Sequence, residues 1–133
     1  MLTKMKNLSI EKTERSPKVY FDYIKHEMEI SGEAYPENND EFYRPIFESL
    51  HAYLTLENDV AINFKFRMIY FNSSSARMLM KIFELLDNTA SNGRQVNIEW
   101  YYLEDDDTMK EFGEDYSEDI EHAIFKMKVQ SEN

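Results

Sequence analysis

The chain of 133 residues contains no cysteine, only three glycines and three prolines, and no long apolar run. The lack of cysteine excludes a disulfide framework and thiol chemistry. No stretch approaches the roughly 20 consecutive apolar residues needed to span a bilayer. The first residues, MLTKMKNLSIEK, include no apolar run typical of a signal peptide. We therefore expect a cytoplasmic location.

The chain also has fewer basic than acidic residues. The chain has 26 acidic and 15 basic residues, which gives a net charge of −11. This charge disfavours nucleic acid and anionic membranes as partners, because both are polyanions, and it favours a partner with a basic face. Hydrophobic residues make up 42% and aromatic residues 14% of the chain, enough for a core. The length predicts a single domain over residues 1–133.

One stretch, residues 60–86, is predicted to join a strand directly to a helix. Every second residue from Ile62 to Tyr70 is apolar, which predicts a strand with this set on one face. The opposite face begins polar, and Ile69 and Phe71 make it apolar toward the carboxyl end. The helix that follows, ARMLMKIFELL, is apolar around most of its circumference, so we expect it to be mostly buried.

The junction between this strand and this helix is the sequence Asn72-Ser73-Ser74-Ser75. Asn72 or Ser73 is the expected N-cap, because a short side-chain oxygen accepts from the free N–H groups of the first turn. The start of a helix carries about half a positive charge, so it favours a phosphate, either on a ligand or on the serine itself. The alternative interpretation is that these serines only cap the helix.

Shorter patterns predict the remaining elements. In chain order these are a strand over 7–13, two hairpin strands over 18–24 and 27–30, a helix to about Leu56, a strand over 95–103, a helix over about 106–116 and a strand over 124–129. Pro45 requires that the first helix begin near Tyr43 or be kinked. Gly113 costs about 1 kcal/mol relative to alanine, which predicts that the third helix is short or irregular.

This order predicts an α/β fold with a small mixed β-sheet. The strand–helix–strand units after residue 60 favour parallel pairs with right-handed crossovers, whereas the opening hairpin favours an antiparallel edge. The strands alternate between apolar and polar residues, which indicates helices packed mainly on one face of the sheet.

No motif in the chain indicates catalysis or a cofactor. The acidic run over residues 104–119 is compatible with a hard cation, but it matches no EF-hand spacing. A solvated acidic face, or a docking surface for a basic partner, explains the same residues. His26, His51 and His122 have no partner at the spacing of a zinc site or a catalytic triad. We therefore expect no active site and no bound metal.

Four segments together resemble the SiaC family of bacterial regulatory phosphoproteins. They are SGEAYPENNDEFY (31–43), IYFNSSSARMLMKIFELL (69–86), VNIEWYYLEDDD (96–107) and EFGEDY (111–116). The combination of S-G-E-x-Y-P-E-N with Y-F-N-[ST]-S-S is specific, and the segments follow the family's order. This family is similar in fold to the STAS domains of anti-sigma-factor antagonists such as SpoIIAA, so the resemblance implies a STAS-like domain.

The resemblance implies a phosphorylation switch at Ser73. In the family, the residue after the Y-F-N asparagine is typically a phosphorylated threonine, and Ser73 offers the same hydroxyl. Ser74 and Ser75 match the serines that follow it. The partners implied are a SiaB-like serine/threonine kinase, a SiaA-like metal-dependent phosphatase and a SiaD-like diguanylate cyclase. The unmodified protein would bind and stimulate the cyclase, which links it to cyclic-di-GMP and biofilm formation, and phosphorylation at Ser73 would block binding.

We expect the partner surface to surround Ser73. Its expected members are Asn72, Ser74, Ser75, Glu33, Tyr35, Pro36, Glu37 and Asn38. A role for the residues of the 31–43 segment requires that this segment lie near the junction in space. Alternatively, Tyr35 and Pro36 only shape the start of the first helix. Two further hypotheses are a STAS-like scaffold without a phosphorylation switch and a metal-dependent enzyme that uses the 104–119 acids.

Overall fold

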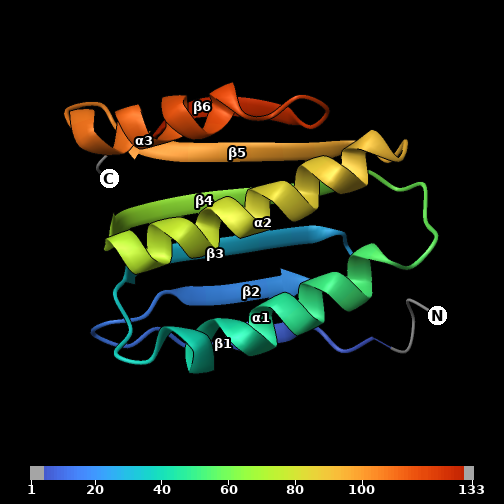
Figure 1. Ribbon diagram of the computed structural model, residues 1–133, viewed down its shortest axis with the longest axis horizontal. Helices are drawn as coiled ribbons and strands as arrows, with labels where there is room; N and C mark the ends of the chain where they lie inside the picture. Colours follow the sequence, from blue (N-terminus) through green and yellow to red (C-terminus); the bar gives the residue numbers. More distant parts are fainter. Residues whose placement is uncertain (1–4, 131–133) are drawn as a thin grey trace.

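The computed structural model describes residues 5–130 as six strands and three helices (Figure 1). The elements are β1 (Leu8–Ile10), β2 (Lys18–Asp22), β3 (Glu27–Ala34), α1 (Asn39–Leu54), β4 (Ile62–Phe71), α2 (Ser73–Ser91), β5 (Val96–Leu103), α3 (Asp107–Glu118) and β6 (Ile124–Gln130). Their order confirms the prediction, and β3 runs four residues beyond its predicted end. No helix within the described part of the chain is long and apolar enough to cross a membrane.

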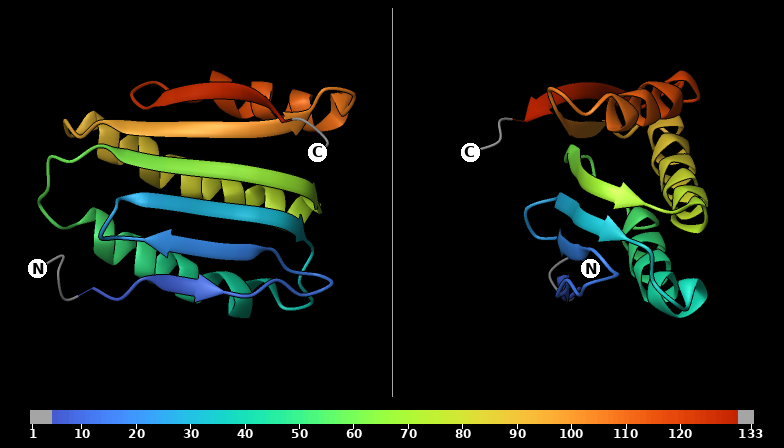
Figure 2. Two further views of the ribbon diagram at one scale, coloured as in Figure 1. Left: turned by 180° about the vertical axis from the view of Figure 1, so that it is seen from behind. Right: turned by 90° about the vertical axis from the view of Figure 1, so that its left-hand side faces the viewer.

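The six strands form one mixed sheet in the order β1-β2-β3-β4-β5-β6. The pairs β1–β2 and β2–β3 are antiparallel, and the pairs from β3 to β6 are parallel. All three helices cover the same face of the sheet, as the right-hand view of Figure 2 shows. The predicted mixed sheet with helices on one face is therefore confirmed. The parallel order also brings the carboxyl ends of β3, β4 and β5 to one edge.

The core lies between the sheet and the helices, and β4 runs through its centre. Ile62, Phe64 and Phe66 of β4 are fully buried, as the period of two predicted. The rings of Phe64 and Phe66 stack with their centroids 4.6 Å apart. Trp100 of β5 is fully buried beside Phe66. This aromatic layer holds the strand that leads into the junction.

A β-bulge interrupts β4 near its carboxyl end. In the pairing of β3 with β4, Gly32 lies opposite Met68 and the next residue, Glu33, lies opposite Tyr70. Ile69 is therefore an extra residue that has no partner on β3. Gly32 has a φ of 112°, a conformation that favours glycine, at the point where the register shifts.

The bulge overturns the predicted faces of the last residues of β4. Tyr70 was expected on the buried face, but it is 51% exposed; Phe71 was expected on the opposite face, but it is only 5% exposed and lies in the core. One inserted residue reverses the alternation from that position onward, which a strict period of two cannot anticipate. Ile69 and Tyr70 therefore both remain exposed, immediately before the junction.

Arg67 spans three neighbouring strands on the face that the helices leave uncovered. Its Nε lies 3.4 Å from Oε1 of Glu29 on β3, and its guanidinium lies 3.8 Å from the centre of the Tyr101 ring on β5. Its Nη1 donates to Oε1 of Gln130 on β6. The backbone pairing of β4 with β5 ends at Phe66, so Arg67 links these strands where their hydrogen-bonded ladder has stopped.

The first helix begins earlier than Pro45 seemed to allow. Asn38 is the N-cap, and its side chain accepts from the backbone N–H of Glu41. Pro45 thus lies inside α1, so of the two alternatives a start near Tyr43 is wrong. The proline ring is exposed, which keeps it clear of the core, although the Glu41 carbonyl has no helical donor opposite it.

The third helix is regular over 12 residues, so the expectation that Gly113 makes it short or irregular is wrong. Gly113 is buried, and a Cβ atom there would lie 2.4 Å from Cδ1 of Trp100 and 2.8 Å from Cε of Met127. The missing side chain lets α3 pack directly on β5 and β6. Nε1 of Trp100 donates to the Met109 carbonyl at 2.9 Å across the same contact. The close contact between α3 and the sheet, which helix propensity does not take into account, therefore explains why a glycine occupies position 113.

We expect Gly113→Ala to destabilise the protein. Overpacking costs about 1–3 kcal/mol, and it acts against a gain of about 1 kcal/mol in helix propensity. Urea unfolding measures the difference, with Glu114→Ala on the exposed side of the same helix as the control. A Gly113→Ala protein at least as stable as the control would contradict the close contact with Trp100.

Asp87 of α2 fastens the connection between α3 and β6. Its Oδ1 accepts from the backbone N–H groups of His122 and Ala123 at 2.8 Å, and its Oδ2 accepts from that of Glu121 at 3.2 Å. Partial burial alone would raise the pKa of Asp87, but these three hydrogen bonds outweigh it and lower the pKa from 3.8. The charged carboxylate is therefore the form that holds the connection.

Asp87 should make stability depend on pH in the acid range. Because its folded-state pKa is depressed, its contribution is present above about pH 4 and is lost as the pH falls through the folded pKa. Asp87→Asn keeps one acceptor oxygen but no charge. We expect this variant to be less stable than the parent at pH 6 and to lose less stability than the parent on acidification. Urea unfolding between pH 3 and pH 6 checks this. Equal pH slopes for the two proteins would show that the carboxylate has no such role.

Candidate functional site

Ser73 is the first residue of α2 and is exposed. Asn72 is the N-cap: its backbone is extended, and its Oδ1 accepts from the Ser75 N–H at 2.9 Å. Asn72, not Ser73, caps the helix. Within residues 5–130, the Ser73 hydroxyl has no hydrogen-bond partner. The interpretation that the serines only cap the helix therefore does not account for Ser73.

The three serines of the junction differ in exposure. Ser73 is exposed, Ser74 is half-buried and Ser75 is fully buried. The Tyr43 hydroxyl donates to Oγ of Ser75 at 2.9 Å. Burial raises the pKa of Tyr43, and the hydrogen bond to Ser75 offsets part of this shift, so the phenol remains a donor. Ser75 thus supports the junction from beneath and is not available to a partner in this conformation.

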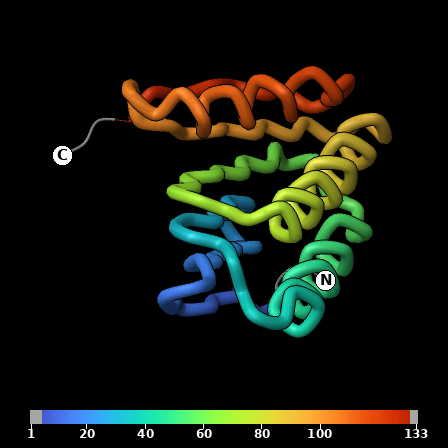
Figure 3. Tube along the Cα trace, turned by 60° about the vertical axis from the view of Figure 1, so that its left-hand side comes forward, coloured from blue at the N-terminus to red at the C-terminus, as the bar shows by residue number. Residues whose placement is uncertain are grey.

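The end of β3 lies directly beside the junction. Ala34 pairs with Phe71, and its carbonyl accepts from the Asn72 N–H at 3.1 Å. The start of α1 is fixed to the same place, because Nδ2 of Asn39 donates to the Ser74 carbonyl at 3.3 Å. Figure 3 shows the chain after β3 passing the first turn of α2 on its way to α1. The segment over residues 31–43 therefore meets the spatial requirement set by its predicted role.

The residues of this segment have distinct surroundings. Tyr35 and Pro36 are half-buried, and the Tyr35 ring meets the Tyr70 ring edge to face with centroids 5.8 Å apart. Glu37 is exposed and pairs with Arg15 at 2.6 Å. Glu33 and Asn38 are also exposed, and the Asn38 side chain is engaged as the N-cap of α1.

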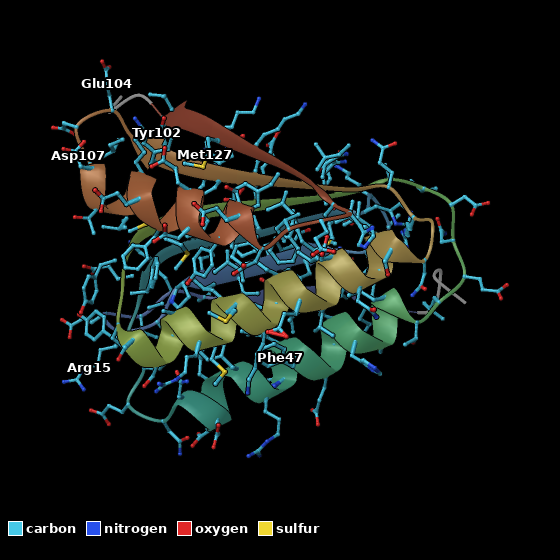
Figure 4. All side chains as sticks on the ribbon, turned by 45° about the horizontal axis from the view of Figure 1, so that its top comes forward. Arg15, Phe47, Tyr102, Glu104, Asp107 and Met127 are labelled. Atoms are coloured by element: carbon cyan, nitrogen blue, oxygen red, sulfur yellow. The ribbon has the colours of Figure 1, made fainter. Side chains whose placement is uncertain are left out.

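The acidic run begins at the same edge of the sheet, where β5 ends. Figure 4 shows Glu104 and Asp107 at the start of α3. Asp106 is the N-cap of α3 and accepts from the Met109 N–H at 3.1 Å, whereas Glu104, Asp105 and Asp107 are exposed. Within residues 5–130, no three His, Asp or Glu side chains are placed to hold a metal ion. The run therefore contributes negative charge to this edge.

The three histidines lie apart from this edge and from one another. His51 on α1 and His122 before β6 are exposed. His26 is buried in the β2–β3 turn, where its Nδ1 lies 2.5 Å from the Tyr53 hydroxyl. Burial, followed by the nearby charge of Arg94, lowers the pKa of His26, which favours its neutral form.

Sequence reasoning missed the residues that support the junction from a distance. Tyr43 and Asn39 both reach it from α1, more than 30 positions earlier in the chain. The spacing of Tyr43, Ile46 and Leu50, all buried, is a helical signal that could have identified Tyr43 as inward-facing. Its particular partner could not have been identified, because the pairing depends on how α1 and α2 pack.

The fold and the site define a class of protein: a small α/β domain that presents an exposed serine where a strand turns into a helix. The sequence profile of the SiaC family of regulatory phosphoproteins matches residues 10–130. The chain belongs to this family, and its fold is the SiaC fold.

Relatives from Pseudomonas aeruginosa support this assignment. An uncharacterized protein of strain UCBPP-PA14 is 27% identical over 115 residues, which are 86% of this chain and 90% of that protein. The crystal structure of apo-SiaC shares 26% identity with a TM-score of 0.85, over 94% of this chain and all of that one. A crystal structure of the diguanylate cyclase SiaD in complex with its activator SiaC matches with 25% identity and a TM-score of 0.87, over 92% and 99% of the two chains.

Removal of the Tyr43 hydroxyl should loosen the junction. Tyr43→Phe leaves the buried Ser75 hydroxyl without this donor, which should cost about 1–2 kcal/mol in the free energy of unfolding. We expect faster amide hydrogen exchange in the first turn of α2. Tyr20→Phe, on the uncovered face of the sheet, is the control, and exchange that is equally fast in both variants would contradict the supporting role of Tyr43.

Proposed function

We propose that the unmodified protein binds and stimulates a diguanylate cyclase, and that phosphorylation of Ser73 blocks this binding. The observation that carries the proposal is the exposed Ser73 hydroxyl, which is free of the capping role at the start of α2. The complex of P. aeruginosa SiaD with its activator SiaC supports a cyclase as the partner. On this proposal the chain is not an enzyme and acts by binding, in a cyclic-di-GMP pathway that controls biofilm formation.

The expected contact surface is the exposed surroundings of Ser73. It comprises Asn72, Ser74, Glu33, Tyr35, Pro36, Glu37 and Asn38. The hydrogen bonds from Asn72 to Ala34 and from Asn39 to Ser74 hold the junction and the 31–43 segment together as one surface. A partner that packs on this surface covers Ser73.

A phosphate on Ser73 acts through charge rather than through refolding. It adds about −1.5 to −2 units of charge at a helix start, where the dipole and the first-turn N–H groups stabilise it. The fold is therefore compatible with the modified state. A packed partner must strip water from this dianion, and burying an uncompensated charge costs several kcal/mol, enough to abolish a micromolar complex.

The modification requires two further enzymes. A SiaB-like serine/threonine kinase adds the phosphate to Ser73, and a SiaA-like metal-dependent phosphatase removes it. Both can reach an exposed side chain such as that of Ser73, which no group within residues 5–130 engages in a hydrogen bond, whereas the Ser75 hydroxyl is buried against Tyr43. The difference in exposure supports Ser73 as the substrate residue.

The charge at Ser73 should switch cyclase stimulation. With P. aeruginosa SiaD as the probe, we expect the parent and Ser73→Ala to raise cyclic-di-GMP formation from GTP, and Ser73→Asp to fail to do so. A buried unpaired charge costs about 3–5 kcal/mol, which corresponds to binding weaker by a factor of about 100 or more. Ser91→Asp, at the exposed far end of the same helix, is the matched control and should behave as the parent does.

The phosphorylated protein completes this test. After incubation with a SiaB-like kinase and ATP, mass spectrometry should find the phosphate on Ser73, and Ser73→Ala should not be labelled. Stimulation by Ser73→Asp equal to that of the parent, or a phosphate on Ser74, would contradict the proposed switch. The first of these results would favour a scaffold without a phosphorylation switch.

A further inference from the structure

Two large apolar side chains are exposed at the bulge in β4, beside the junction. Ile69 is 67% exposed and Tyr70 is 51% exposed, although every second residue of β4 from Ile62 to Met68 is buried. Ile69 lies outside the core by the period of two, and the extra residue leaves Tyr70 outside the core as well. Only Phe71 and Asn72 separate them from Ser73. Exposed apolar side chains that are adjacent to each other are typical of interaction sites, whereas scattered ones are not.

These side chains belong to an ordered surface. Tyr70 pairs with Glu33 in the β3–β4 ladder, and its ring meets that of Tyr35 edge to face. The Tyr35 N–H donates to the Arg15 carbonyl at 2.6 Å, which fixes the residue after β3. We call Tyr35, Ile69 and Tyr70 the bulge patch. Because the backbone of this patch is already fixed, little conformational entropy is lost when a partner binds to it.

The exposed charges at this edge of the sheet are negative on balance. Exposed carboxylates follow the carboxyl ends of β3 and β5, and we call Glu33, Glu37, Glu104, Asp105 and Asp107 the acidic rim. Nearby cations are partly committed: Arg15 pairs with Glu37, and Arg67 contacts Glu29, Tyr101 and Gln130. Two cations at this edge are exposed: Lys18, which pairs with Ser31 of β3, and Arg77, one turn into α2.

We propose that the bulge patch docks a cationic segment of a partner protein that carries an apolar side chain at its centre. This inference rests on the proposed function, because it gives the chemistry of the partner at the same edge. The apolar anchor packs on Tyr35, Ile69 and Tyr70, and lysine or arginine side chains around it face the acidic rim. A second copy of this chain, with its net charge of −11, would bring carboxylates against carboxylates, and polyanions are repelled in the same way.

This geometry is compatible with a blocking phosphate. The cations of the segment are already matched by the carboxylates of the rim, so the contact over Ser73 is the apolar one. A phosphate there would need to lose water without a cation of the segment placed against it. Association should slow as salt is raised, because the rim steers the encounter, whereas the apolar contact is little affected by salt.

Synthetic peptides test the chemistry of the occupant directly. Three helical 18-residue peptides, built from lysine and leucine, from lysine and serine, and from glutamate and leucine, are titrated into the isotopically labelled full chain and followed by NMR. We expect only the lysine–leucine peptide to bind and to shift the signals of Tyr35, Ile69 and Tyr70. Ile69→Ser should weaken it about tenfold. Ile24→Ser, at the β2–β3 turn and 68% exposed, is the matched control and should bind as the parent does.

Several results would overturn the inference. These are no binding of the lysine–leucine peptide, equal binding of the lysine–serine peptide, and equal weakening by Ile69→Ser and Ile24→Ser. Shifts spread over the other acidic surfaces, or centred on the groove between α1 and α2 that Phe47 and Met78 line, would also overturn it. The proposed function fails separately, through stimulation of SiaD by Ser73→Asp. An intact switch combined with peptide shifts elsewhere would refute only the docking surface.

Discussion

The pairing of β3 with β4 is the constraint on which the site depends. It places Ala34 against Phe71 and lets the Ala34 carbonyl accept from Asn72, so the end of one strand and the start of a helix are fixed together. The bulge in the same ladder turns Phe71 into the core and Tyr70 out of it. Strand pairing therefore fixes the start of α2, and one shift in register sets which of the residues before it are exposed.

Support from the helical layer makes this edge rigid. Tyr43 and Asn39 reach the junction from α1, and the Tyr116 hydroxyl on α3 donates to the Ala76 carbonyl at 3.0 Å. Both α1 and α3 thus donate hydrogen bonds to the first turn of α2. An exposed serine on such a platform can change its charge without changing its surroundings, which suits the proposed switch between two states of one shape.

Much of the fold follows from local sequence signals, since hydrophobic period and capping chemistry act over a few residues. The order of the elements, the one-sided sheet and a helix cap at Asn72 or Ser73 were predicted in this way. The errors arose where residues distant in the sequence determine the local structure. The bulge at Ile69 reflects the shift in the pairing of β3 with β4 after Gly32, and the regular helix through Gly113 reflects packing on Trp100. The position of Ser73 was predictable, whereas the hydrogen bond from Tyr43 to Ser75 was not, because their helices meet only in the folded chain.

The close packing of α3 has an optical consequence. Trp100 is the single tryptophan of the chain, is fully buried, and lies within about 6 Å, centroid to centroid, of the Phe71 and Tyr116 rings. Its indole also donates to the Met109 carbonyl, so release of α3 would bring water to the fluorophore. The emission wavelength of this indole therefore reports on the docking of this one helix, since tyrosine and phenylalanine emit at shorter wavelengths.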